Sequence, residues 1–124
     1  MSGPPDAFKD FVQRYPELGE AWSLMARAGE TAGPLSEREQ RLVKLGVSLG
    51  IWQRSVVRSA VRKGVKAGLS PDELEQGVAL AAANIGLPRS VAASQWIREQ
   101  LVELGLVDSG DSADSSGTED GASS

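Results

Sequence analysis

The stretch KAGLSPDELEQGVALAAANIGLP, residues 66–88, contains both ends of one helix. Ser70 and Glu73 have the spacing of a capping box, in which each side chain accepts a hydrogen bond from the backbone N–H of the other residue. A proline stands at the first helical position, where a missing N–H costs least. Gly86 and the proline two residues later mark the end. The stretch therefore predicts a helix over residues 71–85.

Similar signals outside this stretch predict helices along most of the chain. Ser36 and Glu39 form a second capping-box pattern, and Gly68 and Gly105 stand where two further helical patterns end. No stretch alternates apolar and polar residues between turn residues, as a half-buried strand would. The expected helices cover residues 6–13, 17–30, 36–50, 52–67, 71–85 and 89–104. We therefore expect an all-α fold, a compact bundle of about six short helices.

The chain divides by composition into a helical domain and a tail. With 124 residues, of which 40% are apolar, it is large enough for one small globular domain. From Asp108 onward it has five acidic residues, no basic residue and no large apolar side chain. Such a segment cannot bury enough apolar surface to offset its ordering entropy. We predict one helical domain over residues 1–107 and a disordered acidic tail, rich in Ser, Gly and Asp, over residues 108–124.

The residue types that are missing exclude several kinds of active site. The chain contains no cysteine and no histidine. It therefore has no thiolate nucleophile or thiolate metal ligand, and it lacks the commonest catalytic base. We expect no metal site and no cofactor. The N-terminus has no signal-peptide pattern and no apolar run approaches the roughly 20 residues that span a bilayer, so we expect no membrane partner and a cytoplasmic location.

A basic block occupies the middle of the chain. No acidic residue occurs between Glu39 and Asp72, a segment that holds seven basic residues. Four of them recur every four residues beside a valine stripe, which is typical of an amphipathic helix packed on one side. Binding of a nucleic acid or another anionic partner through residues 41–66 is an alternative interpretation. Residues 1–107 carry a net charge of only +1, from 13 basic and 12 acidic residues, so we do not expect nucleic acid to be the partner.

The helix expected over residues 36–50 is unusual because its apolar and small residues continue around the whole circumference beyond Lys44. Gly46 and Gly50 lie four residues apart on one face and permit close approach of another backbone, as do the alanines between residues 79 and 83. So short a chain has little capacity to surround two such helices. We therefore predict a homo-oligomer assembled through them.

The order of these segments resembles the carboxymuconolactone decarboxylase-like family, which includes the alkyl hydroperoxidase D-like proteins. The resemblance covers about residues 34–101 and rests on the following marks: Ala67-Gly68, a turn, Glu73 opening the next helix, an Ala-rich stretch, Gly86-Leu87-Pro88, and the small pair Ala92-Ala93. It implies an alkyl hydroperoxidase D-like helical fold and, for one domain per chain, trimers or hexamers. It also implies a peroxidase or a lactone decarboxylase activity.

The residues that the family uses for this chemistry are replaced. Its peroxidase members have C-x-x-C-x-x-x-H, and counting back from Ala67-Gly68 places the two cysteines at Gln53 and Val56 and the histidine at Ala60. The glutamate of the preceding helix falls near Arg41, and Glu39 is the neighbouring carboxylate. The resemblance therefore implies a degenerate site and favours a protein that is not an enzyme. Residual peroxidase- or decarboxylase-type activity by substitute residues stays an alternative.

The function that the sequence predicts is an oligomeric or small-molecule-binding helical domain. Arg41, Trp52 and Gln53 flank the positions of the lost site. A guanidinium, an indole and an amide can hold an anionic or amphipathic molecule. We accordingly expect a small anionic ligand as one possible partner, beside further copies of the chain.

Overall fold

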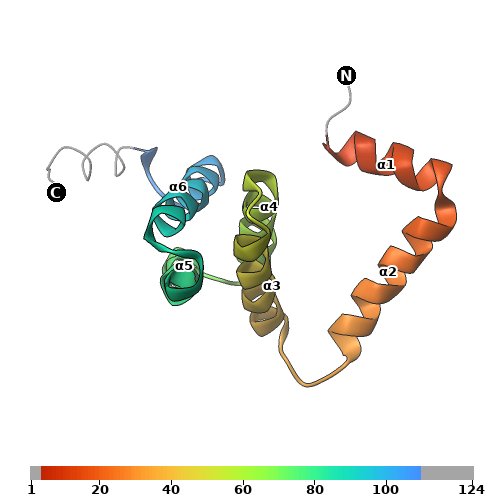
Figure 1. Cartoon of the computed structure of the whole chain (residues 1–124), viewed down its shortest axis with the longest axis horizontal. Coiled ribbons are helices and arrows are strands. Elements are labelled where there is room, and N and C mark those ends of the chain that lie inside the picture. The colour runs from red at the N-terminus through yellow and green to blue at the C-terminus, as the bar shows by residue number, and fades with distance from the viewer. Residues whose placement is uncertain (1–3, 110–124) are drawn as a thin grey trace, which may run out of the picture. The chain divides into compact units, whose positions relative to one another are not determined.

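The computed structural model describes residues 4–109, and this part of the chain consists of six helices without a strand (Figure 1). They are α1 (Pro4–Arg14), α2 (Pro16–Thr31), α3 (Glu37–Ile51), α4 (Arg54–Lys66), α5 (Pro71–Ile85) and α6 (Leu87–Glu103). The all-α prediction is confirmed, and each helix begins and ends within two residues of its expected bounds. From residue 110 onward the predicted acidic tail lies outside the described residues. The chain divides into two compact units, Met1–Leu35 and Ser36–Ser124.

Both predicted capping boxes are present. The Ser36 hydroxyl accepts a hydrogen bond from the Glu39 N–H at 3.2 Å, and the Glu39 carboxylate accepts one from the Ser36 N–H at 2.8 Å. The corresponding distances in the Ser70–Glu73 box are 3.1 and 2.8 Å. These bonds satisfy N–H groups that a helix start leaves without partners.

The second unit consists of two helical hairpins stacked on each other. Two residues join α3 to α4, and Gly86 alone joins α5 to α6. Arg38 of α3 pairs with Glu73 of α5, and Arg54 of α4 pairs with Glu99 of α6, so α3 lies beside α5 and α4 beside α6. The core between the hairpins consists of Leu45, Leu49, Val57, Val61, Leu69, Leu74, Val78, Ala93, Ile97 and Leu101.

Within the chain, α5 approaches α3 tightly at Gly77, and Gly46 and Gly50 of α3 make no such close contact. A Cβ on residue 77 would lie 2.8 Å from Leu45 Cδ2, whereas a Cβ on Gly46 or Gly50 would meet no atom within 4 Å. The single chain therefore covers α3 on one side only. Its inner face is buried at Leu45 and Leu49, and its outer face is exposed at Val43, Val47 and Ile51, among others.

The turn between α3 and α4 differs from the expected one because the chain leaves the helix at Trp52 and not at Gly50. Trp52 adopts a left-handed conformation, with φ 63° and ψ 54°. This region costs an L-residue roughly 1–2 kcal/mol. Contacts of the indole offset that cost: its ring centroid lies 4.5 Å from that of Trp96, and the Arg89 guanidinium lies 5.2 Å from it.

The described residues of the first unit make aromatic contacts but form no buried core. Phe8 of α1 meets Trp22 of α2 edge to face at 5.6 Å, and Val12 packs against Gly19. Within the described chain, no residue of α2 is buried. The large side chains of this unit that are exposed by about half or more are Phe8, Phe11, Tyr15, Leu18, Trp22, Leu24, Met25 and Leu35.

Candidate functional site

Two of the predicted site residues lie near the start of α3. Glu39 is exposed and is engaged as the third residue of its capping box. The Ser36 backbone N–H, and after it the Ser36 hydroxyl, hold the pKa of Glu39 below its ordinary value. Arg41 follows half-buried. Glu39 thus has a structural role whatever other function it serves.

The other predicted residues lie at the α3–α4 turn and along the start of α4. Trp52 is half-buried and Gln53 is exposed, while Val56 and Ala60 are half-buried on α4. Arg41 stands ten residues before the end of α3, which is about 15 Å along a helix axis. The structure therefore brings Trp52 and Gln53 together at one end of the hairpin and places Arg41 well away from them along α3.

Two residues beside Trp52 were not singled out from the sequence. Trp96 packs against the Trp52 indole with the ring planes tilted by 35°, and the Arg89 guanidinium lies over the Trp52 ring. Both come from α6, where they are seven residues, or about two turns, apart. That spacing puts them on one helix face and is the signal that could have identified them as a pair. Arg89 therefore places a guanidinium over the Trp52 ring from a different helix.

The predicted basic stripe of α4 faces the neighbouring helix α6. Arg54 donates to Glu99 at 2.6 Å, and Arg58 pairs with Glu103. Gln100 is only 2% exposed, and its carbonyl oxygen accepts from Arg58 at 2.9 Å and from Arg62 at 3.0 Å. The sequence contained a signal for this pairing, because Glu99 and Glu103 repeat the four-residue spacing of Arg54 and Arg58. Three arginines of the stripe are thus engaged with side chains of α6.

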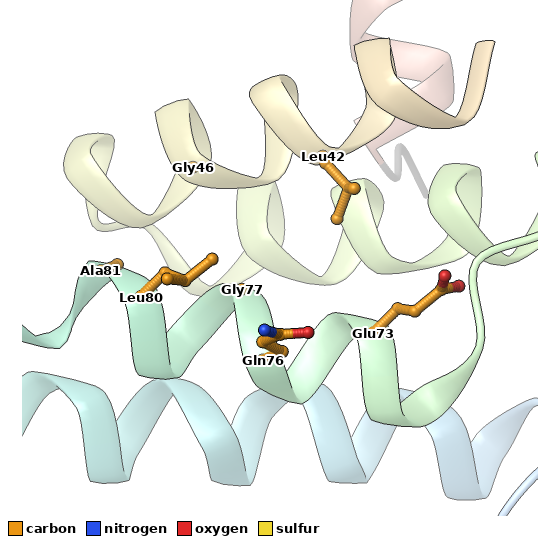
Figure 2. A pocket seen from close by; sticks show the side chains of 7 residues that line it. All are labelled: Leu42, Gly46, Glu73, Gln76, Gly77, Leu80 and Ala81. Carbon is orange, nitrogen blue, oxygen red and sulfur yellow. The ribbon is translucent and has the colours of Figure 1, made fainter. Parts of the chain in front are cut away.

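A groove of about 420 Å³ lies between α3 and α5 (Figure 2). Figure 2 shows the Leu42 side chain extending from α3 toward α5, and Glu73 and Leu80 standing at opposite ends of the α5 segment. Neither Gly46 nor Gly77 has a side chain to fill the space. The residues that line this α3–α5 groove are Leu42, Gly46, Glu73, Gln76, Gly77, Leu80 and Ala81. Sequence reasoning singled out Gly46, Glu73 and the alanine but missed Leu80 and Gln76.

The charged end of the groove is neutralised within the chain. The Arg38 guanidinium donates to the Glu73 carboxylate at 2.6 Å, and the Ser70 N–H donates to it at 2.8 Å. These two hydrogen bonds, that from Arg38 first, hold the pKa of Glu73 below its ordinary value. The remaining lining is apolar apart from the Gln76 amide. The groove is therefore suited to an apolar side chain more than to a free ion.

Two kinds of site are absent from residues 4–109. No three acidic side chains gather there as a metal-binding group would require. Each helix in this part of the chain is too short or too polar to cross a bilayer.

Comparison with known families identifies the chain. The model of the carboxymuconolactone decarboxylase family matches residues 16–99, which is more than half of the sequence. A search of curated proteins and a search of solved structures each gave no match. The matched segment begins at the first residue of α2 and reaches Glu99 in α6, so it includes the α3–α4 turn and both hairpins. The resemblance inferred from the sequence is confirmed: this chain belongs to the carboxymuconolactone decarboxylase family.

Proposed function

We propose that this family member has lost peroxidase and decarboxylase chemistry and acts as a self-assembling helical domain. The positions aligned with the peroxidase motif hold Gln53, Val56 and Ala60, and the chain has no cysteine or histidine to replace them. An amide and two small apolar side chains supply neither a thiolate nor a base that titrates near neutral pH. Binding is therefore the function that the remaining residues support.

The observation that carries the proposal is the exposed outer face of α3. Val43, Val47 and Ile51 are four residues apart, form one stripe and are each more than half exposed. Leu42, Gly46 and Gly50 form a second stripe beside it. Contiguous apolar patches of this kind on a soluble domain mark interaction sites. A second copy of the chain that covers this face gives the oligomer predicted from the sequence.

Light scattering on a sizing column tests the assembly. We expect the full chain to have a mass of three or six times 13.1 kDa. Val47→Glu adds a charge to the outer face of α3 and should yield a folded protein of single-chain mass. Gln95→Glu adds the same charge at an exposed position of α6 and should keep the wild-type mass. A wild-type chain that stays at 13.1 kDa up to high concentration would contradict the proposal.

An enzymatic assay tests the loss of chemistry separately. Peroxide consumption coupled to a dithiol should equal the buffer blank. Consumption above the blank that survives metal chelation would show that substitute residues sustain the residual enzyme activity kept as an alternative.

A small anionic ligand at the Trp52 turn is a second candidate function. The specific observation in its favour is that Arg89 lies over the Trp52 ring while the Gln53 amide is exposed next to it. Titration with phosphate or a short carboxylate should quench tryptophan fluorescence in the wild-type chain and not in Arg89→Ala. Equal quenching in both proteins would rule out this position.

Nucleic acid is not supported as a partner. Arg54, Arg58 and Arg62 donate to side chains of α6, so binding a phosphate backbone would require these pairs to break. Binding through phosphate contacts weakens as the salt concentration rises. We expect no such salt-dependent binding to short duplex DNA or RNA.

A further inference from the structure

The last two turns of α4 carry a group of cations without a counter-charge. Arg62, Lys63 and Lys66 are exposed and lie one, three or four residues apart, so they are neighbours on the helix surface. The helix itself contains no acidic residue. Within residues 4–109, neither lysine forms an ion pair, and Arg62 donates to the neutral amide oxygen of Gln100. We call these three residues the α4 cation cluster.

The acidic side chains on the neighbouring helix α6 are already paired. Glu99 and Glu103 bind Arg54 and Arg58, in the first half of α4. The carbonyl end of a helix favours positive charge, but like charges three or four residues apart destabilise it. The α4 cation cluster therefore favours an anionic partner from outside the two hairpins.

The acidic tail has the complementary composition. From Asp108 to Ser124 it contains five acidic residues, no basic residue and no large apolar side chain. Residues 36–107 contain ten basic and seven acidic residues. The tail thus has a net charge of −5, whereas the helices that precede it in the second unit have a net charge of +3. Such complementarity favours association of the two.

The start of the tail is fixed on the same bundle as the cluster. After α6 the chain turns back at Gly105, where φ is 79°, and the Leu106 N–H donates to the Leu101 carbonyl at 2.9 Å. Val107 then packs, partly buried, against the core between the hairpins. The helix α4 and the start of the tail belong to one compact unit, Ser36–Ser124. The tail therefore begins at a surface that is held in place relative to α4.

The length and the attachment of the tail select it as the occupant over a free anion. Residues 110–124 span up to about 50 Å when extended, and the 13 residues of α4 are only about 20 Å long. A segment tethered over so short a distance has an effective concentration of about 1 mM. An acidic segment of a separate molecule would have to exceed that concentration to displace it.

We infer that the α4 cation cluster is the docking surface of the chain's own acidic tail. Carboxylates from Asp108 onward neutralise Arg62, Lys63 and Lys66. Since Arg54 and Arg58 are paired with α6, the helix α4 then offers no unpaired cation to a nucleic acid or another polyanion. The inference is independent of the proposed self-assembly, which uses the outer face of α3.

Zero-length cross-linking of the full chain tests the docking. A carbodiimide joins a lysine amine to a carboxylate only where the two are in contact. The lysines of the chain are Lys9, Lys44, Lys63 and Lys66. We expect the tail to be joined to Lys63 and Lys66 several-fold more often than to the other two. Raising the salt to about 1 M, where the Debye length is about 3 Å, should remove this preference.

A fluorophore on Ser115→Cys gives a second measurement, because the chain has no other cysteine to react. The anisotropy of the label should be higher at low salt than at high salt. Adding Lys63→Gln and Lys66→Gln should lower the low-salt anisotropy to the high-salt value. Lys9→Gln also removes an exposed lysine, and as the matched control it should leave the anisotropy unchanged. Glutamine and lysine have nearly the same helix propensity, so these variants should keep their helices.

The possible results decide both the surface and the source of the tail. Cross-links spread evenly over the lysines would show that the tail has no preferred surface, and the inference would be wrong. An unchanged anisotropy in the variant that lacks Lys63 and Lys66 would also contradict it. A mixture of isotopically light and heavy chains shows which tail docks. Cross-links within one chain support the inference, whereas cross-links between light and heavy chains would mean that the tail covers a neighbouring copy and would overturn it.

Discussion

Two helix pairs of the same bundle, α4–α6 and α3–α5, make contact in opposite ways. The α4–α6 pair meets through long polar side chains, with Arg54 on Glu99 and with Arg58 and Arg62 on Gln100. Apart from the Arg38–Glu73 ion pair at one end, the α3–α5 pair meets through small and apolar residues, with Gly77 against Leu45 and a groove beside them. Long side chains reach across and close the first contact within one chain. Glycines bring the backbones together at one point but leave the rest of the second contact open.

The α4–α6 contact stabilises the single chain, whereas the outer side of the α3–α5 pair is available for binding. A partner of the α4–α6 pair would have to compete with hydrogen bonds that already exist. A partner of the α3–α5 pair would only have to displace water from exposed leucine and valine side chains, which is favourable. We therefore expect substitutions to affect stability on the first pair and in the core, and assembly on the outer side of the second.

The largest contrast is expected between two leucines on opposite sides of the α3–α5 pair. Leu49 is 0% exposed, and Leu49→Ala should lower the free energy of unfolding by about 2–5 kcal/mol. Leu80 is 73% exposed, and Leu80→Ala should change it by less than about 0.5 kcal/mol in the single chain. Urea unfolding at low protein concentration measures both. Comparable losses would mean that Leu80 is covered within one chain and does not line an open α3–α5 groove.

The next contrast concerns the buried amide of the α4–α6 pair. Gln100→Leu keeps the volume but leaves the guanidinium N–H groups of Arg58 and Arg62 without their acceptor, which should cost about 1–3 kcal/mol. Gln100→Glu keeps an acceptor for both arginines and should lose much less. The same urea experiment compares them. A neutral Gln100→Leu would show that the polar contact contributes nothing to closing the pair.

Alanine substitutions at the two glycines of the groove should have smaller effects on stability, with opposite signs at the two positions. Alanine in place of glycine within a helix gains roughly 0.5–1 kcal/mol. Gly46→Ala should show this gain because its Cβ meets no atom within 4 Å. Gly77→Ala should instead lose about 1 kcal/mol, since its Cβ would lie 2.8 Å from the buried Leu45 Cδ2 and overpacking exceeds the gain. Thermal melts give the change in unfolding free energy for each variant. A change of the same sign in both variants would refute the tight contact between Gly77 and Leu45.

The smallest effect is a pH dependence at the charged end of the groove. The hydrogen bonds from Arg38 and Ser70 hold the pKa of Glu73 below 4.5, so the folded state is stabilised above that pH. This contribution is lost as the pH falls from 4.5 through the lowered pKa. Glu73→Gln should therefore flatten the acid side of the stability curve, and Arg38→Met should flatten it too. Curves that superimpose on the wild type below pH 4.5 would contradict the assignment.

The helices, the two capping boxes and the family could be predicted because their signals are local. A serine three residues before a glutamate, or a glycine at a helix end, acts on backbone groups within one turn. The contacts between helices could not be predicted in the same way. Nothing near Gly46 or Gly77 in the sequence says which of them faces Leu45, because that depends on how the second hairpin is placed on the first.

The candidate site shows the same division. Spacing alone assigned Gln53, Val56 and Ala60 to the family positions. The residues that contact the Trp52 ring, Trp96 and Arg89, come from a helix more than thirty residues away. The left-handed conformation of Trp52 has no local signal in the sequence, because that backbone is usually adopted by glycine.

The two adjacent indoles at this turn give a spectroscopic signal that reports how the bundle assembles. Trp52 belongs to the first hairpin and Trp96 to the second, and their ring centroids are 4.5 Å apart. Two transition dipoles so close couple, and the coupling exists only while the hairpins are docked. A near-ultraviolet dichroic band from this pair therefore reports docking, whereas the far-ultraviolet signal reports helix formation. Followed together in a stopped-flow experiment, the two signals resolve whether each hairpin forms before the two meet.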